Sequence, residues 1–308
     1  MTYLLDINQL YNEDCLECMN RIDNKSIDCI ITDLPYGQTS RNKWDSVIPF
    51  EPLWEQYERV IKDNGAIILF ANGMFTADLM HSNRKLWRYN LIWEKTQPTG
   101  FLNAKKMPLR SHEDICIFYK KPPTYNPQKT TGHTRKVSKA EHKVNCKQSL
   151  DYGESGLTTY DSTERYPKSV WTFAKDIQKC AIHPTQKPVA LIEELIKTYT
   201  NEGELVLDSC AGSMTTAVAT INTNRNYICI EKDKEIFEVG KKRVEKRLME
   251  YKKIYYEERE AEMKKEYEAF ILTESGKEWK KGWQEQMGSD SCGDFGDYLY
   301  DFYPEMLQ

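Results

Sequence analysis

Short apolar runs alternate with helix-like repeats over most of the chain. Uninterrupted apolar runs bounded by Asp, Asn or Gly are typical of strands that are buried on both faces. They predict strands at residues 27–32, 66–71, 89–93, 114–119, 204–208 and 227–231. Apolar residues at helical spacing predict helices at residues 12–22, 50–62, 189–199 and 215–220. This alternation indicates an α/β fold with a mostly parallel sheet covered on both faces.

The regular pattern is interrupted in the middle of the chain. Residues 121–180 are rich in Pro, Gly, Thr, Lys and Tyr and contain few apolar runs. A loop-rich insertion of this length in a compact protein usually has a function of its own. A long stretch of mixed charge begins at Lys234, as on solvated helix faces. We therefore expect four segments, at residues 1–120, 121–180, 181–250 and 251–308.

Charge is distributed unevenly along the 308 residues. The formal net charge is −4, but residues 95–187 contain 17 Lys and Arg against 8 Asp and Glu. Residues 288–308 contain five acidic residues and no basic ones, which makes an acidic tail. Because a polyanion responds to the local field, the basic middle of the chain is a candidate nucleic-acid surface. A solvated loop that binds nothing would have the same composition.

Composition also bears on compartment and metal content. The chain has no apolar stretch long enough to span a membrane and no signal-peptide pattern at its start, so we expect a cytoplasmic protein. The odd number of cysteines, nine, argues against a disulfide framework. Cys15 and Cys18 have the spacing of half a zinc site, but no second pair complements them. We expect no bound metal.

Asp33-Leu34-Pro35-Tyr36 directly follows the first predicted strand. The carboxyl ends of the strands border the ligand crevice of an α/β sheet, so these residues are expected to face a site. An exocyclic base amine is a poor nucleophile because its lone pair is delocalised into the ring. The Asp33 carboxylate and the carbonyl of Leu34 or Pro35 can accept its two N–H bonds, and Tyr36 can stack on an everted base. A simple strand-ending turn is the alternative interpretation.

A second candidate site follows the strand at residues 204–208. Asp208 ends this strand, and a helix begins at Thr215. Small residues occupy the turn between them, at Ala211, Gly212 and Ser213. A helix N-terminus favours an anionic group, and glycine allows close approach of a ligand. Glu231 ends the next strand, where a carboxylate can bind ribose hydroxyls. By itself this pattern also fits a NAD site or a turn without a ligand.

A third motif, His183-Pro-Thr-Gln-Lys-Pro188, lies between the insertion and this turn. Alone it could simply cap the following helix, where Pro188 suits the first turn. Together, the three motifs resemble the β group of amino-methylating DNA methyltransferases. In that group an Asp/Ser-Pro-Pro-Tyr motif precedes a target-recognition segment, a His-x-x-Gln-Lys-Pro motif and the cofactor loop. The resemblance covers about residues 8–250 and includes Leu10-Tyr-Asn-Glu-Asp-Cys-Leu-Glu and His112-Glu-Asp-Ile-Cys-Ile-Phe-Tyr.

The resemblance implies a Rossmann-like methyltransferase sheet of seven strands with circularly permuted motif order. Residues 1–120 would form the catalytic half, residues 121–180 the inserted target-recognition segment, and residues 181–250 the cofactor half. It also implies methyl transfer from S-adenosylmethionine to an amino group of double-stranded DNA by base flipping. Asp rather than Ser at position 33 favours adenine N6, and cytosine N4 is the alternative target.

The resemblance also assigns roles to individual residues. The catalytic residues would be Asp33, Leu34, Pro35 and Tyr36. The cofactor-binding residues would be Asp14, Thr185, Lys187, Asp208, Ala211, Gly212, Ser213, Thr215 and Glu231. Basic residues of the middle segment are candidates for phosphate contacts, namely Lys105, Lys106, Arg110, Arg135, Lys136 and Lys139. No cysteine nucleophile is needed, because an amino nitrogen can attack the methyl group directly.

Two positions depart from the family pattern. Leu34 replaces the first proline of the catalytic motif and leaves the backbone carbonyl in place. Met214 replaces a glycine of the cofactor loop, where a positive φ would strain it and its side chain would add bulk beside the ligand. A DNA-binding relative without catalysis, or a NAD-dependent oxidoreductase, are the alternatives from other classes. The recognition sequence, a homodimer and a restriction endonuclease partner cannot be read from the sequence.

Overall fold

The computed structural model describes residues 5–37, 46–138, 160–176 and 186–287, and positions 294, 295, 298 and 302 near the C-terminus. Thr185 and Lys139, to which the sequence assigns roles, lie outside these residues. The chain divides into two compact units, Met1–Val244 and Glu245–Gln308, which are described separately below.

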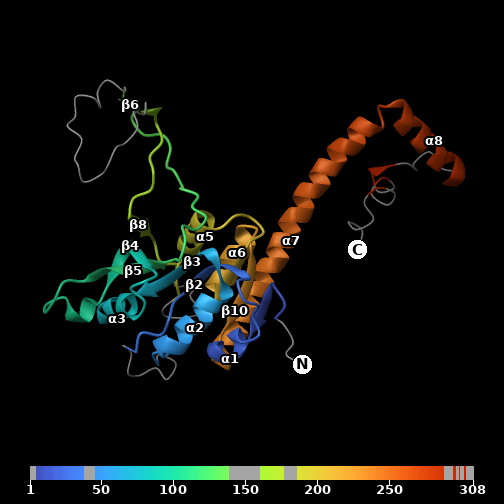
Figure 1. The fold of residues 1–308 in the computed structure, drawn as a ribbon. Helices are drawn as coiled ribbons and strands as arrows, with labels where there is room; N and C mark the ends of the chain where they lie inside the picture. Colours follow the sequence, from blue (N-terminus) through green and yellow to red (C-terminus); the bar gives the residue numbers. More distant parts are fainter. Residues whose placement is uncertain are drawn as a thin grey trace. The chain divides into compact units, whose positions relative to one another are not determined.

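An eight-stranded sheet forms the centre of the first unit (Figure 1). Its order is β1 (Gln9–Tyr11), β10 (Asn226–Ile230), β9 (Leu205–Asp208), β2 (Ile27–Thr32), β3 (Ile61–Ala71), β5 (Arg110–Phe118), β4 (Trp87–Thr99) and β8 (Val170–Phe173). Among these described strands only β5 runs against the others, because both of its neighbours pair with it antiparallel. The prediction of a mostly parallel sheet is confirmed.

The eighth strand, β8, is one more than the family resemblance implies, and it comes from the middle segment. It pairs parallel with β4, with Ile92 opposite Val170 and Lys95 opposite Phe173. Trp93 of β4 stabilises this pairing, because its indole Nε1 donates to the carbonyl oxygen of Phe173 in β8 over 3.1 Å. Residues 170–173, which lie in the segment expected to be rich in loops, therefore extend the sheet.

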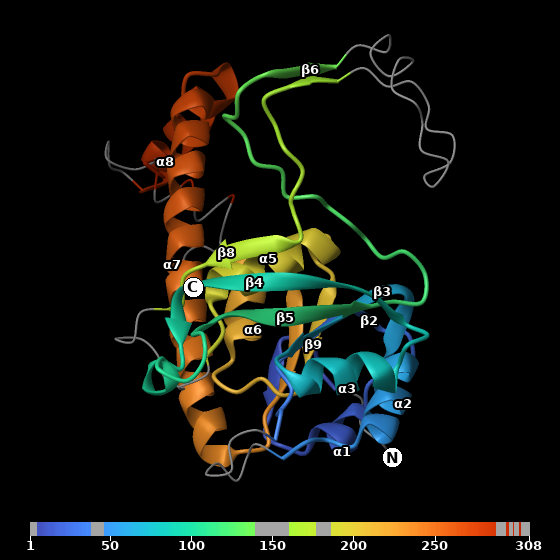
Figure 2. The same ribbon diagram turned by 90° about the vertical axis from the view of Figure 1, so that its left-hand side faces the viewer.

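Helices cover both faces of the sheet (Figure 2). One face packs against α1 (Cys15–Met19), α2 (Phe50–Val60) and α3 (Met74–Ser82), and the other packs against α5 (Val189–Tyr199) and α6 (Thr215–Asn222). Successive side chains of β3 alternate between the two cores, with Ile67 and Leu69 on the first side and Ile68 and Phe70 on the second. Burial on both faces explains why the central strands are continuous apolar runs in the sequence.

Between β5 and β8 the chain leaves the sheet and returns to it (Figure 2). Short strands β6 (Lys136–Ser138) and β7 (Tyr160–Ser162) pair antiparallel on this excursion. Its base is fixed to the end of α5, because the Asn126 backbone N–H donates to the carbonyl of Thr198 over 2.7 Å. The Asn126 side-chain amide also donates to the carbonyl of Thr200 over 3.1 Å. The middle segment is thus anchored at its base.

The second unit contains the later turns of α7 (Lys234–Phe270) and helix α8 (Glu274–Met287). Aromatic side chains hold it together, with the Phe270 ring centroid 5.7 Å from that of Trp279 and 5.6 Å from that of Tyr298. The helical character agrees with the charge pattern of this segment. In the part of the chain that the structure describes, no helix is both long and apolar enough to cross a membrane.

Candidate active site

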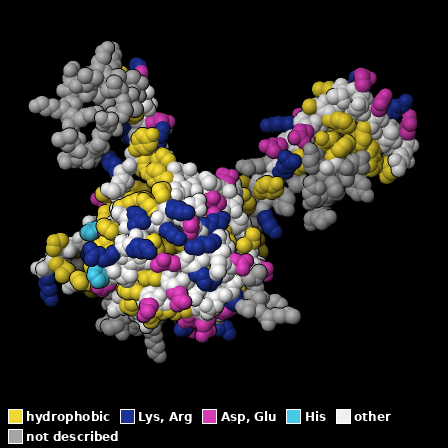
Figure 3. Space-filling model, viewed as in Figure 1, with side chains coloured by type: hydrophobic (Ala, Val, Ile, Leu, Met, Phe, Trp, Pro, Cys, Tyr) yellow, Lys and Arg dark blue, Asp and Glu magenta, His cyan; other side chains and the backbone are white. Residues whose placement is uncertain are grey.

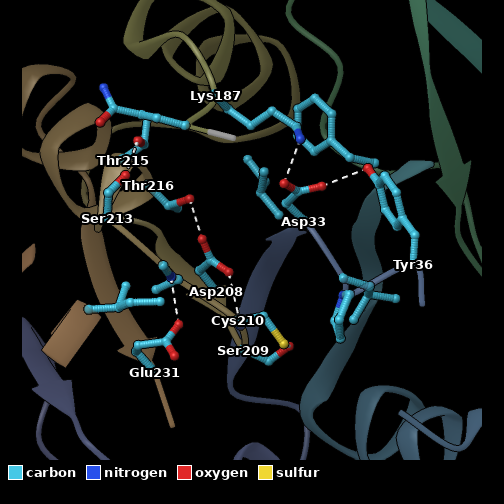
Figure 4. Close-up of a pocket in the computed structure, with 18 of the residues that line it drawn as sticks. Asp33, Tyr36, Lys187, Asp208, Ser209, Cys210, Ser213, Thr215, Thr216 and Glu231 are labelled. Carbon is cyan, nitrogen blue, oxygen red and sulfur yellow. Dashed lines mark hydrogen bonds and ion pairs between the residues drawn. The ribbon is translucent and has the colours of Figure 1, made fainter. Parts of the chain in front are cut away.

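A cavity of about 1070 Å³ opens where β2, β9 and β10 end at the carboxyl edge of the sheet. Residues from both halves of the first unit line it, among them Asp14 and Gly212. Figure 4 shows Asp33, Lys187, Asp208 and Glu231 around this space. Strands β2 and β9 are neighbours, and just past their pairing the Ser209 backbone N–H donates to Thr32 Oγ1 over 3.2 Å. The structure therefore brings the first and second sequence motifs to one cavity.

Asp33 is held by donors on both of its carboxylate oxygens. The Tyr36 hydroxyl donates to Oδ1 over 2.6 Å, and Lys187 Nζ donates to Oδ2 over 2.5 Å. The Asp33 side chain is 27% exposed, whereas Leu34 is buried in the core. The Tyr36 ring packs at a tilt against Phe75, with centroids 4.9 Å apart. The Asp33 carboxylate, predicted to be catalytic, is therefore held in a fixed position at the wall of the cavity.

Asp208 is a buried carboxylate with neutral partners among the described residues. Thr216 Oγ1 donates to its Oδ2 over 2.5 Å, and the Cys210 backbone N–H donates to its Oδ1 over 3.2 Å. Burial, helped by the negative charges of Asp33 and Glu231, raises the pKa of Asp208 to about 7, although its two hydrogen bonds act to lower it. A group of this kind is well suited to a cationic ligand.

Glu231 and Asp14 line the same cavity as Asp33. Glu231 follows β10 and Asp14 follows β1, which lie two and three strands from β2 in the sheet. The two Glu231 oxygens accept the backbone N–H groups of Gly212 and Asp233, each over 2.8 Å. Burial raises the pKa of Glu231. Asp14 caps α1 by accepting the Leu16 backbone N–H over 2.9 Å. Both carboxylates thus have structural partners and still border the open space.

A family comparison decides what kind of site this is. A model described as DNA methylase, covering N6 and N4 methyltransferases, matches residues 27–242. The chain belongs to this family. It is a DNA amino-methyltransferase, and the NAD-dependent oxidoreductase alternative is therefore wrong.

Individual relatives agree with the family match. The methyltransferase is 27% identical over 264 residues to the type II methyltransferase M2.MboI of Moraxella bovis, covering 76% of this chain and 86% of the relative. It is 27% identical over 246 residues to the DNA adenine methyltransferase YhdJ of Escherichia coli K12, covering 75% and 81%. Its fold matches the M1.HpyAVI–SAM complex with a TM-score of 0.53 and 23% identity, covering 77% of this chain and 98% of that chain. It also matches the cytosine-N4-specific PvuII DNA methyltransferase, with a TM-score of 0.56 and 15% identity, covering 82% and 94%.

Lys187 of the methyltransferase lies in a buried cluster of charges. Besides Asp33, Lys187 Nζ pairs with Glu113 Oε2 over 3.3 Å, and Lys95 Nζ pairs with Glu113 Oε1 over 2.5 Å. Burial acts to lower the pKa of Lys187, but the charges of Asp33 and Glu113 outweigh it and raise the pKa above its usual value. The structure thus places Lys187, expected to bind the cofactor, on Asp33, the carboxylate that the sequence predicts to be catalytic.

Sequence reasoning gave no role to Glu113 or Lys95. Glu113 is on β5 and Lys95 is on β4, so only the pairing of these strands brings them together. The side chains are 14% and 6% exposed, and charged groups so deeply buried need partners. Both strands contain several other polar and charged residues, so the sequence pattern alone did not single out these two.

The cofactor loop adopts the conformation that a glycine would favour. Met214 has φ 60° and ψ 35°, in the left-handed region, and Gly212 has φ 50°. The Met214 side chain is fully buried and is absent from the residues that line the cavity. It points to α7, where a Cβ at Gly240 would come within 2.6 Å of Met214 Cγ. The expectation of bulk beside the ligand is therefore wrong, although the positive φ is present.

A second residue of α7 fixes this loop from the same side. Arg243 Nη1 donates to the Ser213 carbonyl and to Thr215 Oγ1, each over 2.9 Å. Ser213 and Thr215 line the cavity along with Ala211. The early turns of α7 thus position the loop, a role that the sequence did not indicate.

The predicted DNA-contacting residues are spread over two places. Arg110 lines the mouth of the cavity, and the exposed Lys105 and Lys106 precede it between β4 and β5. Arg135 and Lys136 lie near and on β6, where Arg135 Nη2 pairs with Asp161 over 2.6 Å. Within the described residues, no group of three or more His, Cys, Asp and Glu could hold a metal ion.

Proposed function

We propose that the protein transfers a methyl group from S-adenosylmethionine to the N6 amino group of adenine in duplex DNA. The observation that carries this proposal is the shared cavity, which has the Asp33 acceptor on one wall and the Asp208–Glu231 carboxylates on another. Asp at position 33 favours adenine in the resemblance to the β group. The relative YhdJ, a DNA adenine methyltransferase, supports the same target.

The chemistry of the cavity wall fits this cofactor. S-adenosylmethionine has a cationic amino group, a carboxylate and ribose hydroxyls, and it supplies an activated methyl group on sulfur. We assign the amino group to Asp208, whose partners are neutral, and the ribose hydroxyls to Glu231. Asp14 is assigned to the adenine of the cofactor. The carboxylate belongs near the start of α6, where the N-terminal dipole favours an anion. The residues of that turn are Ala211, Gly212, Ser213 and Thr215.

The residues of the catalytic motif act on the target amine. Each carboxylate oxygen has two lone pairs, so Asp33 can accept an N–H of the base while it keeps its bonds to Tyr36 and Lys187. The carbonyl of Leu34 or Pro35 accepts the second N–H. These acceptors draw the nitrogen towards a tetrahedral form whose lone pair points at the methyl group. After transfer, the nitrogen carries one proton too many, and Asp33 is placed to take it.

The middle segment is assigned to target recognition. Residues 121–180 leave the sheet after β5, where their base is anchored to α5, and return through β8, which leads to Lys175 at the cavity. Basic side chains there, including Lys136, can hold phosphates while polar groups read base edges. Residues 1–120 and 181–250 then form the catalytic and cofactor halves of one domain.

Nucleoside mass spectrometry tests the proposal. Purified protein is incubated with mixed-sequence duplex DNA and S-adenosylmethionine bearing a labelled methyl group. We expect labelled N6-methyladenine from the wild type and none from Asp33→Ala, while cofactor binding of the variant stays within about threefold. Asp63→Ala, which removes an exposed carboxylate near the start of β3 and outside the cavity lining, is the matched control and keeps activity. Labelled N4-methylcytosine would overturn the adenine assignment, and no label with folded protein would overturn the activity.

A further inference from the structure

The connection between β4 and β5 ends in an exposed apolar tip. It contains the short helix η1 (Phe101–Asn103), and the exposed fractions of its large side chains are 81% for Phe101, 98% for Leu102 and 57% for Met107. Large apolar side chains clustered at one exposed place usually mark an interaction site. Figure 1 shows this tip beyond β4 and β5, and Figure 3 shows hydrophobic and basic side chains gathered there.

The tip has a defined backbone. Asn103 N–H donates to the carbonyl of Gly100 over 2.9 Å, and Lys106 N–H donates to the carbonyl of Asn103 over 2.8 Å. Gly100, with φ 90°, makes the sharp entry into η1 that other residues rarely adopt. The apolar side chains are therefore presented by an ordered turn.

The two strand residues at the base of this tip line the cavity. Thr99 and Arg110 are paired residues of β4 and β5, and both line the cavity that contains Asp33. Residues 98–112 contain no acidic side chain, and Lys105, Lys106 and Arg110 form no ion pair with a carboxylate among the described residues. The exposed apolar side chains of the tip could contact an apolar, stacked interior of a partner, and the surrounding cations could pair with anionic groups on its surface. Duplex DNA has both properties.

We propose that Phe101 and Leu102 form a wedge that enters the base stack beside the target nucleotide and keeps it everted. Lys105 and Lys106 hold the flanking phosphates. This inference rests on the proposed function. Asp33 lies within the cavity and not on the outer surface, so a base must leave the duplex to reach it, and eversion costs unstacking energy. Apolar side chains inserted into a base step are a known way to offset that cost. A second copy of the chain is a poorer partner, because a symmetric contact would bring like charges together.

The test compares a stacked with an already opened substrate. The methylated site is first located by long-read sequencing of treated DNA. Two duplexes of that site are then used, one fully paired and one with a mismatch opposite the target base. For the double variant Phe101→Ser/Leu102→Ser, we expect kcat/KM to fall at least tenfold on the paired duplex and less than threefold on the mismatched duplex. Leu272→Ser, which changes a 76% exposed side chain in the second unit, is the control and should change neither.

A fluorescence experiment gives an independent readout. With 2-aminopurine in place of the target base, wild-type protein should raise the fluorescence of the paired duplex, and the double variant should lose most of this rise. Equal losses of kcat/KM on both duplexes, or unchanged kcat/KM, would overturn the wedge. A change of sedimentation from dimer to monomer, with the ratio of the two substrates unchanged, would instead assign the tip to self-association. If the wild type methylates neither duplex, the proposed function itself has failed.

Discussion

Replacing Asp208 by Asn should stabilise the cofactor-free protein and weaken cofactor binding. The substitution keeps the hydrogen bonds, because an Asn carbonyl can accept the Cys210 N–H and its amide can donate to the Thr216 hydroxyl. What changes is the charge. Burial raises the pKa of Asp208 from 3.8 to about 7, so the folded protein binds this proton more tightly than the unfolded chain does.

The size of the stability effect follows from that shift. One pKa unit corresponds to about 1.4 kcal/mol, so the ionised Asp208 costs on the order of 4 kcal/mol once the pH exceeds 7. For a raised carboxyl pKa the cost is absent below about pH 4, grows as the pH rises to about 7, and is constant above. Calorimetry should therefore give Asp208→Asn a higher Tm than the wild type at pH 8, by roughly 5 °C or more, and a similar Tm at pH 4.5.

Cofactor binding should respond in the opposite direction. A hydrogen bond to a charged group contributes roughly 1.5–3 kcal/mol, so the Kd for S-adenosylmethionine should rise about 10- to 100-fold in Asp208→Asn. For the wild type, affinity should fall by up to about tenfold for each pH unit below 7, because Asp208 must lose its proton to pair with a cation. Titration calorimetry of both proteins, with Asp63→Asn as the surface control, measures this. A variant that is less stable at pH 8, or that binds the cofactor as the wild type does, would refute the reasoning.

Three further variants test the surroundings of the site. Gly240→Ala places a Cβ 2.6 Å from Met214 Cγ, so it should lower stability by about 1–3 kcal/mol and weaken cofactor binding, and adding Met214→Gly, which removes the clash, should restore cofactor binding by calorimetry. Lys187→Met should lower kcat about 100-fold by freeing Asp33 while the cofactor Kd changes less than threefold, and a large rise in Kd would instead support the cofactor role expected from the sequence. Glu113→Gln removes a charge that raises the pKa of Lys187, so kcat measured from pH 7 to 10 should begin its alkaline decline at lower pH; an unshifted profile would contradict this.

The sequence predicted the elements whose burial is uniform along their length. Strand β2 has the predicted bounds, residues 27–32, because both of its faces are covered and every position except Asp28 is buried. Helix α5 also matches its predicted residues, 189–199, since Pro188 marks its start. Strands β1 and β8 were missed because they are short edge strands, and in β8 exposed and buried residues alternate. Over three or four residues such a pattern does not differ from a loop.

The candidate site divides in the same way. Asp33 and Asp208 could be placed from the sequence because each ends a central strand, and the ends of neighbouring parallel strands meet at one edge. The pairing of Lys187 with Asp33 could not be placed, because the two residues are 154 positions apart, and Glu113 reaches Lys187 only through the β3–β5–β4 pairing. Charge pairing of this kind depends on register, which single-sequence patterns do not specify.

Met214 shows how a local conflict can be resolved by a distant residue. A methionine with φ 60° costs strain that glycine would not, and the loop keeps that conformation. The side chain does not enter the cavity, because α7 carries Gly240 where any Cβ would collide with it, and Arg243 ties the adjoining carbonyl to the same helix. The strain is thus offset by burial of a large apolar side chain at the loop–helix contact. The steric objection to catalysis that the sequence raises does not hold in the folded protein, because the position that looked like an obstruction faces α7 instead of the ligand.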